Sequence, residues 1–364
     1  MPPSRRNPPS TSVSSAAADP DEEALLSELQ GWTFALPESA IARRPPAVRG
    51  GSRLLVEDRA GGRTDAQFAD LHRWLRPGDL LVGNDTRVLP ARLFATRPTG
   101  GRVELLVLGP GPGPVPAMVR PARRLRAGSA LILADGSEAT VCSDPHDGVV
   151  TVQLPEDPVA LLQRLGEIPL PPYLDRAADA DDADRYQTVY ANAPASAAAP
   201  TAGLHFTAPH LAALAAAGIG FTTVTLEVGI GTFRPLRAED LARGQLHAER
   251  WTVPSETAKR IAATRAAGGR VVAIGTTSVR TLEAATPAGA LGPEPGSGTT
   301  RLFIRPGYAF RAVDALITNF HLPESSLLML VGAFLGQERT LDAYRHAVAS
   351  GYRFYSYGDA MLLL

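Results

Sequence analysis

The chain has 364 residues, of which 45% are hydrophobic and 20% are charged, and its net charge is −1. This composition supports a buried core and excludes both a wholly disordered chain and a uniformly basic nucleic-acid binder. No apolar run approaches the ~20 residues of a membrane-spanning helix, so the longest, residues 327–335, predicts a buried core helix. The single cysteine, Cys142, excludes an internal disulfide, a cysteine-clustered zinc site and a cysteine-held iron–sulfur cluster. We expect no metal and, since no secretory signal is visible, a cytoplasmic protein.

The first part of the chain predicts a tail followed by the start of an α/β domain. Residues 1–28 are rich in Pro, Ser, Ala and acidic residues and are expected to be a disordered tail. Residues 29–87 are expected to open the α/β domain, with strands at 52–58 and 80–82.

Residues 88–158 differ in pattern from the segments on either side. Short β-rich runs at 103–108, 130–133 and 149–154 alternate with Gly and Pro, and no amphipathic helix interrupts them. This pattern predicts a small antiparallel β-barrel inserted into the α/β domain.

Residues 159–364 are expected to complete the α/β domain. Helical and apolar strand patterns alternate there, which is typical of a mixed or largely parallel sheet. The Ala- and Pro-rich segments near 176–200 and 284–299 are expected to be loops. The expected helices are 209–217 and 255–267, and the expected strands are 222–226, 271–274 and 312–318.

Two glycine turns follow predicted strands. Gly275 is followed by three hydroxyl residues and a helix start, where free backbone N–H groups bind polar or anionic ligands. An ordinary helix N-cap is the alternative. Gly229 and Gly231 follow the strand at 222–226, where they allow close approach of a ligand or simply make a tight turn. Ligand sites in α/β sheets gather at the carboxyl ends of strands.

Two histidines and a C-terminal segment add candidate groups. His205 precedes a predicted helix and either transfers a proton or serves as a satisfied structural histidine. Asn319 and His321 end an apolar strand. Tyr357 and Asp359 lie in an aromatic-rich segment that either offers stacking faces or packs in the core.

The strongest charge bias lies within the predicted barrel. Residues 86–130 hold eight arginines against one acid, Glu104, a net charge of +7 on a chain whose total is −1. Such a one-sided segment favours a polyanion-binding surface over a merely solvated face.

Taken in order, these segments resemble the S-adenosylmethionine:tRNA ribosyltransferase-isomerase family of queuosine biosynthesis. The resemblance runs from about residue 32 to the end of the chain, and its specificity comes from the number of blocks rather than from any one motif. The blocks are residues 52–56, 84–94, 100–104, 167–173, 186–190, 200–206, 275–283, 306–334 and 352–360.

The resemblance implies an α/β domain with a β-barrel insertion and a defined reaction. The family transfers and isomerises the ribosyl moiety of S-adenosylmethionine onto 7-aminomethyl-7-deazaguanine at the wobble position of tRNA. The products are epoxyqueuosine-tRNA, adenine and methionine. This chemistry needs a base for the acidic C–H beside the sulfonium and an acid for the departing adenine. It implies S-adenosylmethionine and tRNA as partners, with no membrane and no obligate protein partner.

The segments singled out above are expected to supply these groups, and we expect His205, His321 and the turn at 275–278 to share one pocket. The expected catalytic residues are His205, His321, Asp85 and Asp359. The expected S-adenosylmethionine contacts are Gly229, Gly231, Thr232, Thr276, Thr277, Ser278, Arg280, Asn319 and Tyr357. The expected tRNA contacts are Arg87, Arg92, Arg120, Arg123, Arg124 and Arg126.

At two positions the chain departs from the family pattern. The family usually has histidine where this chain has Glu227 and Gly244. The departures leave open a relative that acts on a different acceptor, or a protein that binds tRNA or a nucleotide without catalysis. Release of adenine from S-adenosylmethionine, with and without modified tRNA, separates the three hypotheses.

Overall fold

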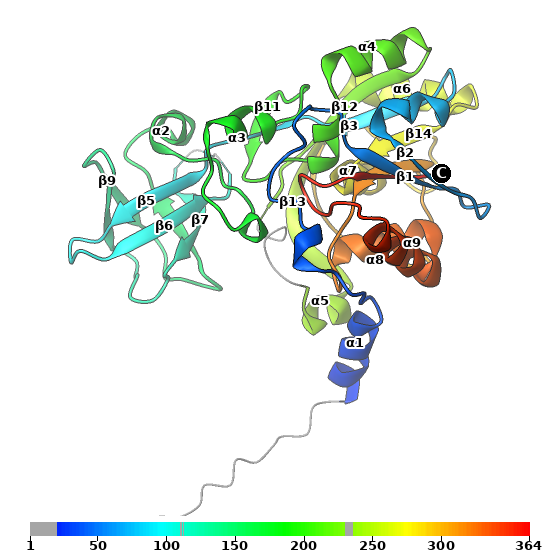
Figure 1. Cartoon of the computed structure of the whole chain (residues 1–364). Helices are drawn as coiled ribbons and strands as arrows, with labels where there is room; N and C mark the ends of the chain where they lie inside the picture. Colours follow the sequence, from blue (N-terminus) through cyan, green and yellow to red (C-terminus); the bar gives the residue numbers. More distant parts are fainter. Residues whose placement is uncertain (1–19, 110, 112, 230–235) are drawn as a thin grey trace, which may run out of the picture.

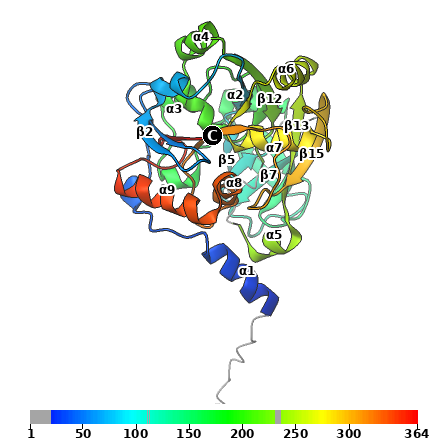
Figure 2. The same cartoon turned by 90° about the vertical axis from the view of Figure 1, so that its right-hand side faces the viewer.

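The structure, a computed structural model, describes residues 20–109, 111, 113–229 and 236–364 (Figure 1). Within those residues, one large sheet with flanking helices forms an α/β body, and a closed barrel lies beside it (Figure 1). In the turned view of Figure 2, barrel strands lie behind the body. This arrangement confirms the predicted fold class, a mixed-sheet α/β domain with a small antiparallel barrel.

The described part of the sheet has nine strands. Their spatial order is β15 (Gly296–Leu302), β13 (Gln245–Val253), β12 (Gly220–Leu226), β3 (Leu80–Asn84), β14 (Val271–Ile274), β16 (Ala315–Asn319), β17 (Ala360–Leu363), β1 (Arg53–Glu57) and β2 (Arg63–Gln67). The α-helices are α1 (Pro20–Gln30), α2 (Pro158–Leu165), α3 (Ala180–Arg185), α4 (Ala208–Ala216), α5 (Ala238–Arg243), α6 (Ser255–Ala266), α7 (Thr276–Ala285), α8 (Ser326–Leu335) and α9 (Gln337–Ala349). The 3₁₀ helices are η1 (Glu38–Ala40), η2 (Phe68–Arg73), η3 (Pro172–Leu174) and η4 (Thr201–His205).

The direction of the strands creates one functional edge. β12, β3, β14 and β16 run parallel to one another, so their carboxyl ends meet at the same edge of the sheet. β17 is antiparallel to β16 and parallel to β1, so both of these strands begin at that edge. We call it the carboxyl edge. Ligand sites of α/β sheets are expected there.

Alternation along the strands gives the sheet two buried faces. On β16, Ala315 and Ile317 pack with Phe206 of the segment after η4, whereas Leu316 packs with residues of α7 and α8 on the other side. The first face, which we call the η4 face, also holds η2 and α4. The second, which we call the α7 face, is covered by α6, α7, α8 and α9. The period of two in a strand explains this division.

The barrel has its own core. Its strands, in the order in which they pair, are β10 (Val149–Gln153), β7 (Val115–Arg120), β6 (Arg102–Val107), β5 (Arg92–Thr96), β8 (Ala130–Leu133) and β9 (Glu138–Val141). On β5, Leu93 and Ala95 point into the barrel while Phe94 and Thr96 are exposed. Between barrel and body, β4 (Thr86–Val88) pairs with β11 (Ala193–Ser196). The barrel strands fall within the predicted interval 88–158.

Several segments are more ordered than the sequence suggested. Residues 20–28, expected in the tail, belong to α1, because Leu25 and Leu29 are one helical turn apart and pack against the body. The segment 176–200, expected as a loop, contains α3 and β11, and β15 begins inside the second expected loop, 284–299. Ala and Pro content alone did not reveal the tertiary contacts that order these segments.

Candidate active site at the carboxyl edge of the sheet

His205 lies on the η4 face of the carboxyl edge, with both ring nitrogens hydrogen-bonded. Its Nδ1 is 2.7 Å from Ser52 Oγ, and Asn319 Nδ2 donates to its Nε2 at 3.1 Å. Since the amide nitrogen can only donate, Nε2 is the unprotonated nitrogen and Nδ1 donates to Ser52. Burial, and then the charge of Arg353, lowers the pKa of His205 to about 3, so the imidazole is neutral.

Asn319 links His205 to two neighbouring segments. Its Oδ1 accepts from Thr201 Oγ1 at 3.0 Å, and its Nδ2 also donates to the carbonyl of Tyr355 at 3.1 Å. A residue predicted to contact S-adenosylmethionine therefore has its amide committed to the protein. In this arrangement Asn319 and His205 fix one another.

Asp85 follows β3 at the same edge. Its carboxylate accepts from Thr223 Oγ1 at 3.1 Å and from Thr225 Oγ1 at 2.7 Å, both on β12. The side chain is buried, and burial of Tyr190, followed by the charge of Asp85, raises the pKa of the Tyr190 phenol. The phenol of Tyr190 is therefore protonated and able to donate.

Tyr190 is wedged between two glycines. A Cβ at Gly83 would lie 2.9 Å from its ring, and a Cβ at Gly203 would lie 2.2 Å from its hydroxyl. Both positions need glycine because a side chain would displace the ring. Among the described residues, neither the buried Tyr190 hydroxyl nor the buried Thr188 Oγ1, which also adjoins Gly203, has a hydrogen-bond partner.

The turn after β14 adds a further unpartnered hydroxyl. Gly275 has a φ of 86°, its N–H donates to Ile317 O at 2.7 Å, and it lies close to Ala202 of η4. Ser278 Oγ donates back to Ile274 O at 2.8 Å, so this hydroxyl is used within the helix. The buried Oγ1 of Thr277, in contrast, bonds to no described residue. Of the expected hydroxyl cluster, Thr277 is thus the group open to a ligand.

Arg280 and Glu249 form a buried ion pair one helical turn along α7. Glu249 also accepts from the N–H of Gly229 at 3.3 Å, which connects β13 to the turn that begins at Gly229. Arg280 Nε donates to Leu302 O at 3.1 Å, but its buried Nη2 has no hydrogen-bond partner within the described part of the chain. Burial lowers the pKa of Arg280 to about 10, so the guanidinium keeps its charge at neutral pH.

Three predicted site residues are engaged elsewhere. His321 bonds through Nε2 to Thr318 Oγ1 at 2.9 Å, and burial lowers its pKa to about 3. Thr318 alternates with Asn319, so this pair lies toward the α7 face rather than beside His205. Asp359 accepts the backbone N–H groups of Arg53 and Arg353, and Tyr357 donates to Asp182 at 2.7 Å. The structure does not join His321 to the predicted pocket.

The remaining predicted positions divide into described and undescribed ones. Thr276 is buried at the start of α7, while Gly231 and Thr232 lie outside the described residues. Glu227 is partly buried and pairs with Arg250 at 3.3 Å, and burial raises its pKa against the opposing charge of Arg250. Gly244 caps α5 with a φ of 60°, in the left-handed region of backbone conformation that glycine favours. The left-handed backbone at this helix end thus accounts for the glycine at position 244.

The predicted tRNA contacts differ in their surroundings. Arg87 donates to Ala191 O, Arg126 to Leu125 O, and Arg92 both pairs with Glu104 and donates to Leu170 O. Arg120, Arg123 and Arg124 are exposed and have no ion-pair partner among the described residues. The last three are the cations most open to a polyanion.

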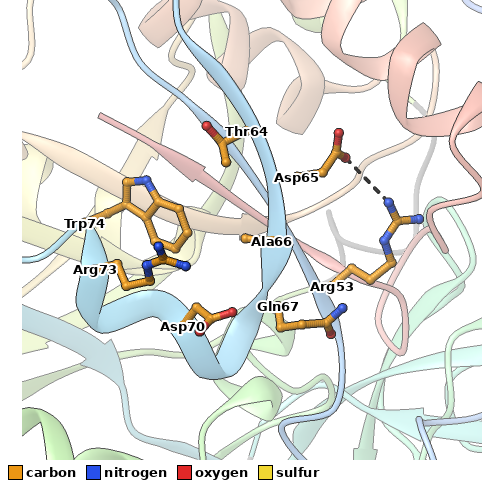
Figure 3. Close-up of a pocket in the computed structure, with 8 residues that line it drawn as sticks. All are labelled: Arg53, Thr64, Asp65, Ala66, Gln67, Asp70, Arg73 and Trp74. Atoms are coloured by element: carbon orange, nitrogen blue, oxygen red, sulfur yellow. Dashed lines mark hydrogen bonds and ion pairs between the residues drawn. The ribbon is translucent and has the colours of Figure 1, made fainter.

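A separate cleft of about 550 Å³ lies at the outer edge of the sheet (Figure 3). It is lined by β2 and η2 residues together with Arg53, which pairs with Asp65 at 3.5 Å (Figure 3). None of the predicted site residues lines it. In the part of the chain that the structure describes, no cluster of His, Cys, Asp or Glu could hold a metal, and no helix could cross a membrane.

The carboxyl edge therefore combines saturated and unsaturated polar groups. Buried polar atoms are nearly always hydrogen-bonded, so the groups of Tyr190, Thr188, Thr277 and Arg280 that lack a partner among the described residues call for a water molecule or a polar ligand. Three of these groups are hydroxyls and one is a cation, a set suited to a carboxylate and neighbouring polar atoms. The sequence analysis did not single out Tyr190, Thr188 or Glu249. Their only indication was that the first two fall in the block 186–190.

Comparisons with known proteins agree over nearly the whole chain. A family model described as "Queuosine biosynthesis protein" matches residues 29–363. A protein of Anaeromyxobacter dehalogenans (strain 2CP-C), named S-adenosylmethionine:tRNA ribosyltransferase-isomerase, is 54% identical over 344 residues, covering 92% of this chain and 99% of its own length. A protein of the same name from Azoarcus sp. (strain BH72) is 54% identical over 339 residues, covering 92% and 97%. The crystal structure of the S-adenosylmethionine tRNA ribosyltransferase of Thermotoga maritima matches with a TM-score of 0.54 and 35% identity, covering 92% of this chain and 100% of that one.

Proposed function

The chain belongs to the queuosine biosynthesis protein family, and we propose that it acts as an S-adenosylmethionine:tRNA ribosyltransferase-isomerase. It transfers and isomerises the ribosyl moiety of S-adenosylmethionine onto 7-aminomethyl-7-deazaguanine in tRNA, giving epoxyqueuosine-tRNA, adenine and methionine. The observation that carries this assignment within the molecule is the set of buried, unpartnered donors at the carboxyl edge. It stands beside a barrel rich in exposed arginines.

Arg280 and Thr277 are proposed to bind the carboxylate of the methionine moiety. Arg280 Nη2 and Thr277 Oγ1 are buried donors one helical turn apart on α7. A charge-assisted hydrogen bond from a buried guanidinium is about twice as strong as a neutral one. Glu249 holds the guanidinium in place through Nη1 and itself accepts from the N–H of Gly229, so Nη2 is left without a hydrogen-bond partner among the described residues.

Tyr190 is proposed as a donor to the substrate, and His205 as a positioning residue. The Tyr190 hydroxyl is protonated, buried and unpartnered, so it can donate to a leaving or ring nitrogen without first breaking a protein contact. His205 would have to release Ser52 or Asn319 before moving a proton. Its hydrogen bonds favour a role in fixing Asn319, and proton transfer by His205 itself is the competing hypothesis.

The barrel is proposed to bind the tRNA through its phosphates. The support is the net charge of +7 between residues 86 and 130, with Arg120, Arg123 and Arg124 exposed and without ion-pair partners among the described residues. Phosphate contacts supply most sequence-independent affinity.

Adenine release tests the proposal directly. The purified chain is incubated with S-adenosylmethionine and either tRNA bearing 7-aminomethyl-7-deazaguanine, the same tRNA with guanine, or no tRNA. Adenine in the first reaction only, together with a tRNA-bound epoxyqueuosine detected by mass spectrometry, is the expected result. Adenine with another acceptor would favour the relative of altered specificity, which the replacement of two family histidines by Glu227 and Gly244 leaves open. Binding of S-adenosylmethionine without adenine release in any reaction would contradict an enzymatic role.

A further inference from the structure

An aromatic side chain stands exposed on the outer face of the barrel. Phe94 on β5 has 36% of its surface accessible, and it is the one exposed aromatic side chain among the described residues. Its neighbours in the strand, Leu93 and Ala95, fill the barrel core, so Phe94 points outward by alternation. The ring lies outside the barrel core, so its face is available to a ligand on the outer surface of the barrel.

The neighbours of Phe94 on this face are charged. The guanidinium of Arg102 lies 5.6 Å from the centre of its ring. In the register of the strands, Phe94 on β5 lies opposite Glu104 on β6, and Glu104 lies opposite Arg120 on β7. Glu104 is the acid of this surface, and Arg92 neutralises it at 3.0 Å. Arg102 and Arg120 have no ion-pair partner among the described residues, so the exposed ring lies beside one uncompensated cation, Arg102, and a second, Arg120, lies two strands away on β7.

The cross-strand partner of Phe94 contacts the segment that returns to the body. A crevice is lined by Glu104 and Arg120 on the barrel and by Leu170 and Pro172 on that segment. The next residue, Tyr173, stacks on Tyr355 with ring centres 4.0 Å apart. The carbonyl of Tyr355 accepts from Asn319, the partner of His205. A chain of contacts thus leads from Glu104, the cross-strand partner of Phe94, through the protein to the proposed active site.

We infer that Phe94, with Arg102 beside it, is a stacking platform for an unpaired base of the tRNA. The inference rests on the proposed function for the identity of the RNA. Aromatic faces bind unpaired bases because duplex bases are already stacked, and neighbouring arginines hold the phosphates of the same strand. The platform is distinct from Arg123, Arg124 and Arg126, whose contribution is charge alone.

Fluorescence anisotropy with two labelled RNAs tests the platform: an anticodon stem–loop and a blunt duplex of the same length. We expect Phe94→Ala to weaken binding of the stem–loop about tenfold, with binding of the duplex and the slope of log Kd against log salt unchanged. Phe94→Trp should restore stem–loop binding, since the larger ring keeps the stacking face. Arg102→Ala should instead lower the salt slope by ~1 for both RNAs.

Two outcomes would overturn the platform. One is unchanged binding of the stem–loop by Phe94→Ala, and the other is an equal loss for stem–loop and duplex. Because Phe94 points away from the barrel core, its replacement should leave the melting temperature nearly unchanged, and the Trp variant separates stacking from a packing defect. Adenine release by the wild-type protein is measured alongside, so that failure of the proposed function is seen independently of the RNA-binding result.

Discussion

The carboxyl edge of the body and the outer face of the barrel differ in how exposed their polar groups are and in how many of those groups have partners. At the edge, a few polar groups are buried, most are hydrogen-bonded to one another, and the exceptions are single atoms such as Arg280 Nη2 and Tyr190 Oη. On the barrel, the charged groups are exposed, and Arg120, Arg123 and Arg124 lack ion-pair partners in the described part of the chain. The edge can select a small ligand by exact placement of donors, whereas the barrel can attract a polyanion before any base is read.

This contrast separates the experimental variables to which each region responds. Buried donors act at short range and are little screened, so substitutions at the edge should change catalysis at any ionic strength. Exposed cations act through the counterions they displace, so substitutions on the barrel should change the salt dependence of RNA binding. The predictions below use these different responses.

The largest effect is expected from Arg280→Lys at the carboxyl edge. The substitution keeps a positive charge beside Glu249 and removes the unpartnered Nη2, so kcat/KM for S-adenosylmethionine should fall about 10- to 100-fold, mainly through KM. Arg339→Lys is the matched control, because Arg339 also pairs with a buried glutamate, Glu57, but donates to Gly62 O as well. The control should lower the melting temperature without raising KM. Equal kinetic losses in both variants would argue against ligand binding by Arg280.

On the barrel, we expect the combined replacement of Arg123, Arg124 and Arg126 by Ala to weaken tRNA binding about tenfold or more at low salt. The slope of log Kd against log salt should fall by ~2, because each lost phosphate contact removes somewhat less than one unit. KM for S-adenosylmethionine should stay the same. Replacing the exposed body arginines Arg76, Arg301 and Arg345 is the control for total charge. An equal change of slope in the control would remove the distinction between the two regions.

Tyr190→Phe removes a single hydroxyl and tests whether that group contributes to catalysis at the carboxyl edge. The lost hydroxyl has no partner in the described structure, so stability should be unchanged while kcat/KM falls about tenfold if the hydroxyl donates to substrate. Tyr352→Phe is the opposite case, since its hydroxyl donates to Asp65 at 2.6 Å, away from the site. It should lower the melting temperature and leave kcat/KM intact. Unchanged kinetics in Tyr190→Phe would make Tyr190 a packing residue.

We expect acid to lower the stability of the body, because two of its histidines are buried. Burial lowers the pKa of both His205 and His321 to about 3, against about 6.5 in the unfolded chain, so between these values the unfolded state binds more protons. The free energy of unfolding should therefore fall as the pH drops below about 6.5, and each histidine should contribute ~1.4 kcal/mol per pH unit. Urea titrations between pH 6.5 and 4.5 measure this slope. His321→Gln should reduce it by one such contribution, and an unchanged slope would contradict neutral burial of His321.

The sequence predicted the architecture better than the site. Alternation of strands and helices predicted a mixed or largely parallel sheet, and the short β-rich runs between Gly and Pro predicted the barrel. The turn at Gly275 and Asn319 were expected at strand ends, and the structure places both at the carboxyl edge; Asp85, which only the family resemblance suggested, lies at the same edge. The sequence could not predict the register of β16. That register turns Asn319 toward His205, whereas it turns Thr318 and its partner His321 toward the opposite face of the sheet. Nor could spacing reveal that Gly83 and Gly203 leave room for Tyr190, since that contact joins three separate segments.

The smallest effect concerns α1, which belongs to neither region. Removal of residues 1–19 should leave the melting temperature unchanged, as their composition predicts. Removal of residues 1–30 should lower it by a few degrees, because Leu29, only 8% exposed, packs on the body and Glu28 pairs with Arg305 at 3.3 Å. Burial of a leucine contributes ~2 kcal/mol, which in a chain of this size corresponds to that shift. Leu29→Ala should reproduce most of the loss by differential scanning calorimetry without changing the chain length. Since the main helix neighbour of α1 is α5, KM for S-adenosylmethionine and the salt slope of tRNA binding should both be preserved. A change in either would mean that α1 acts on a ligand site rather than on stability alone.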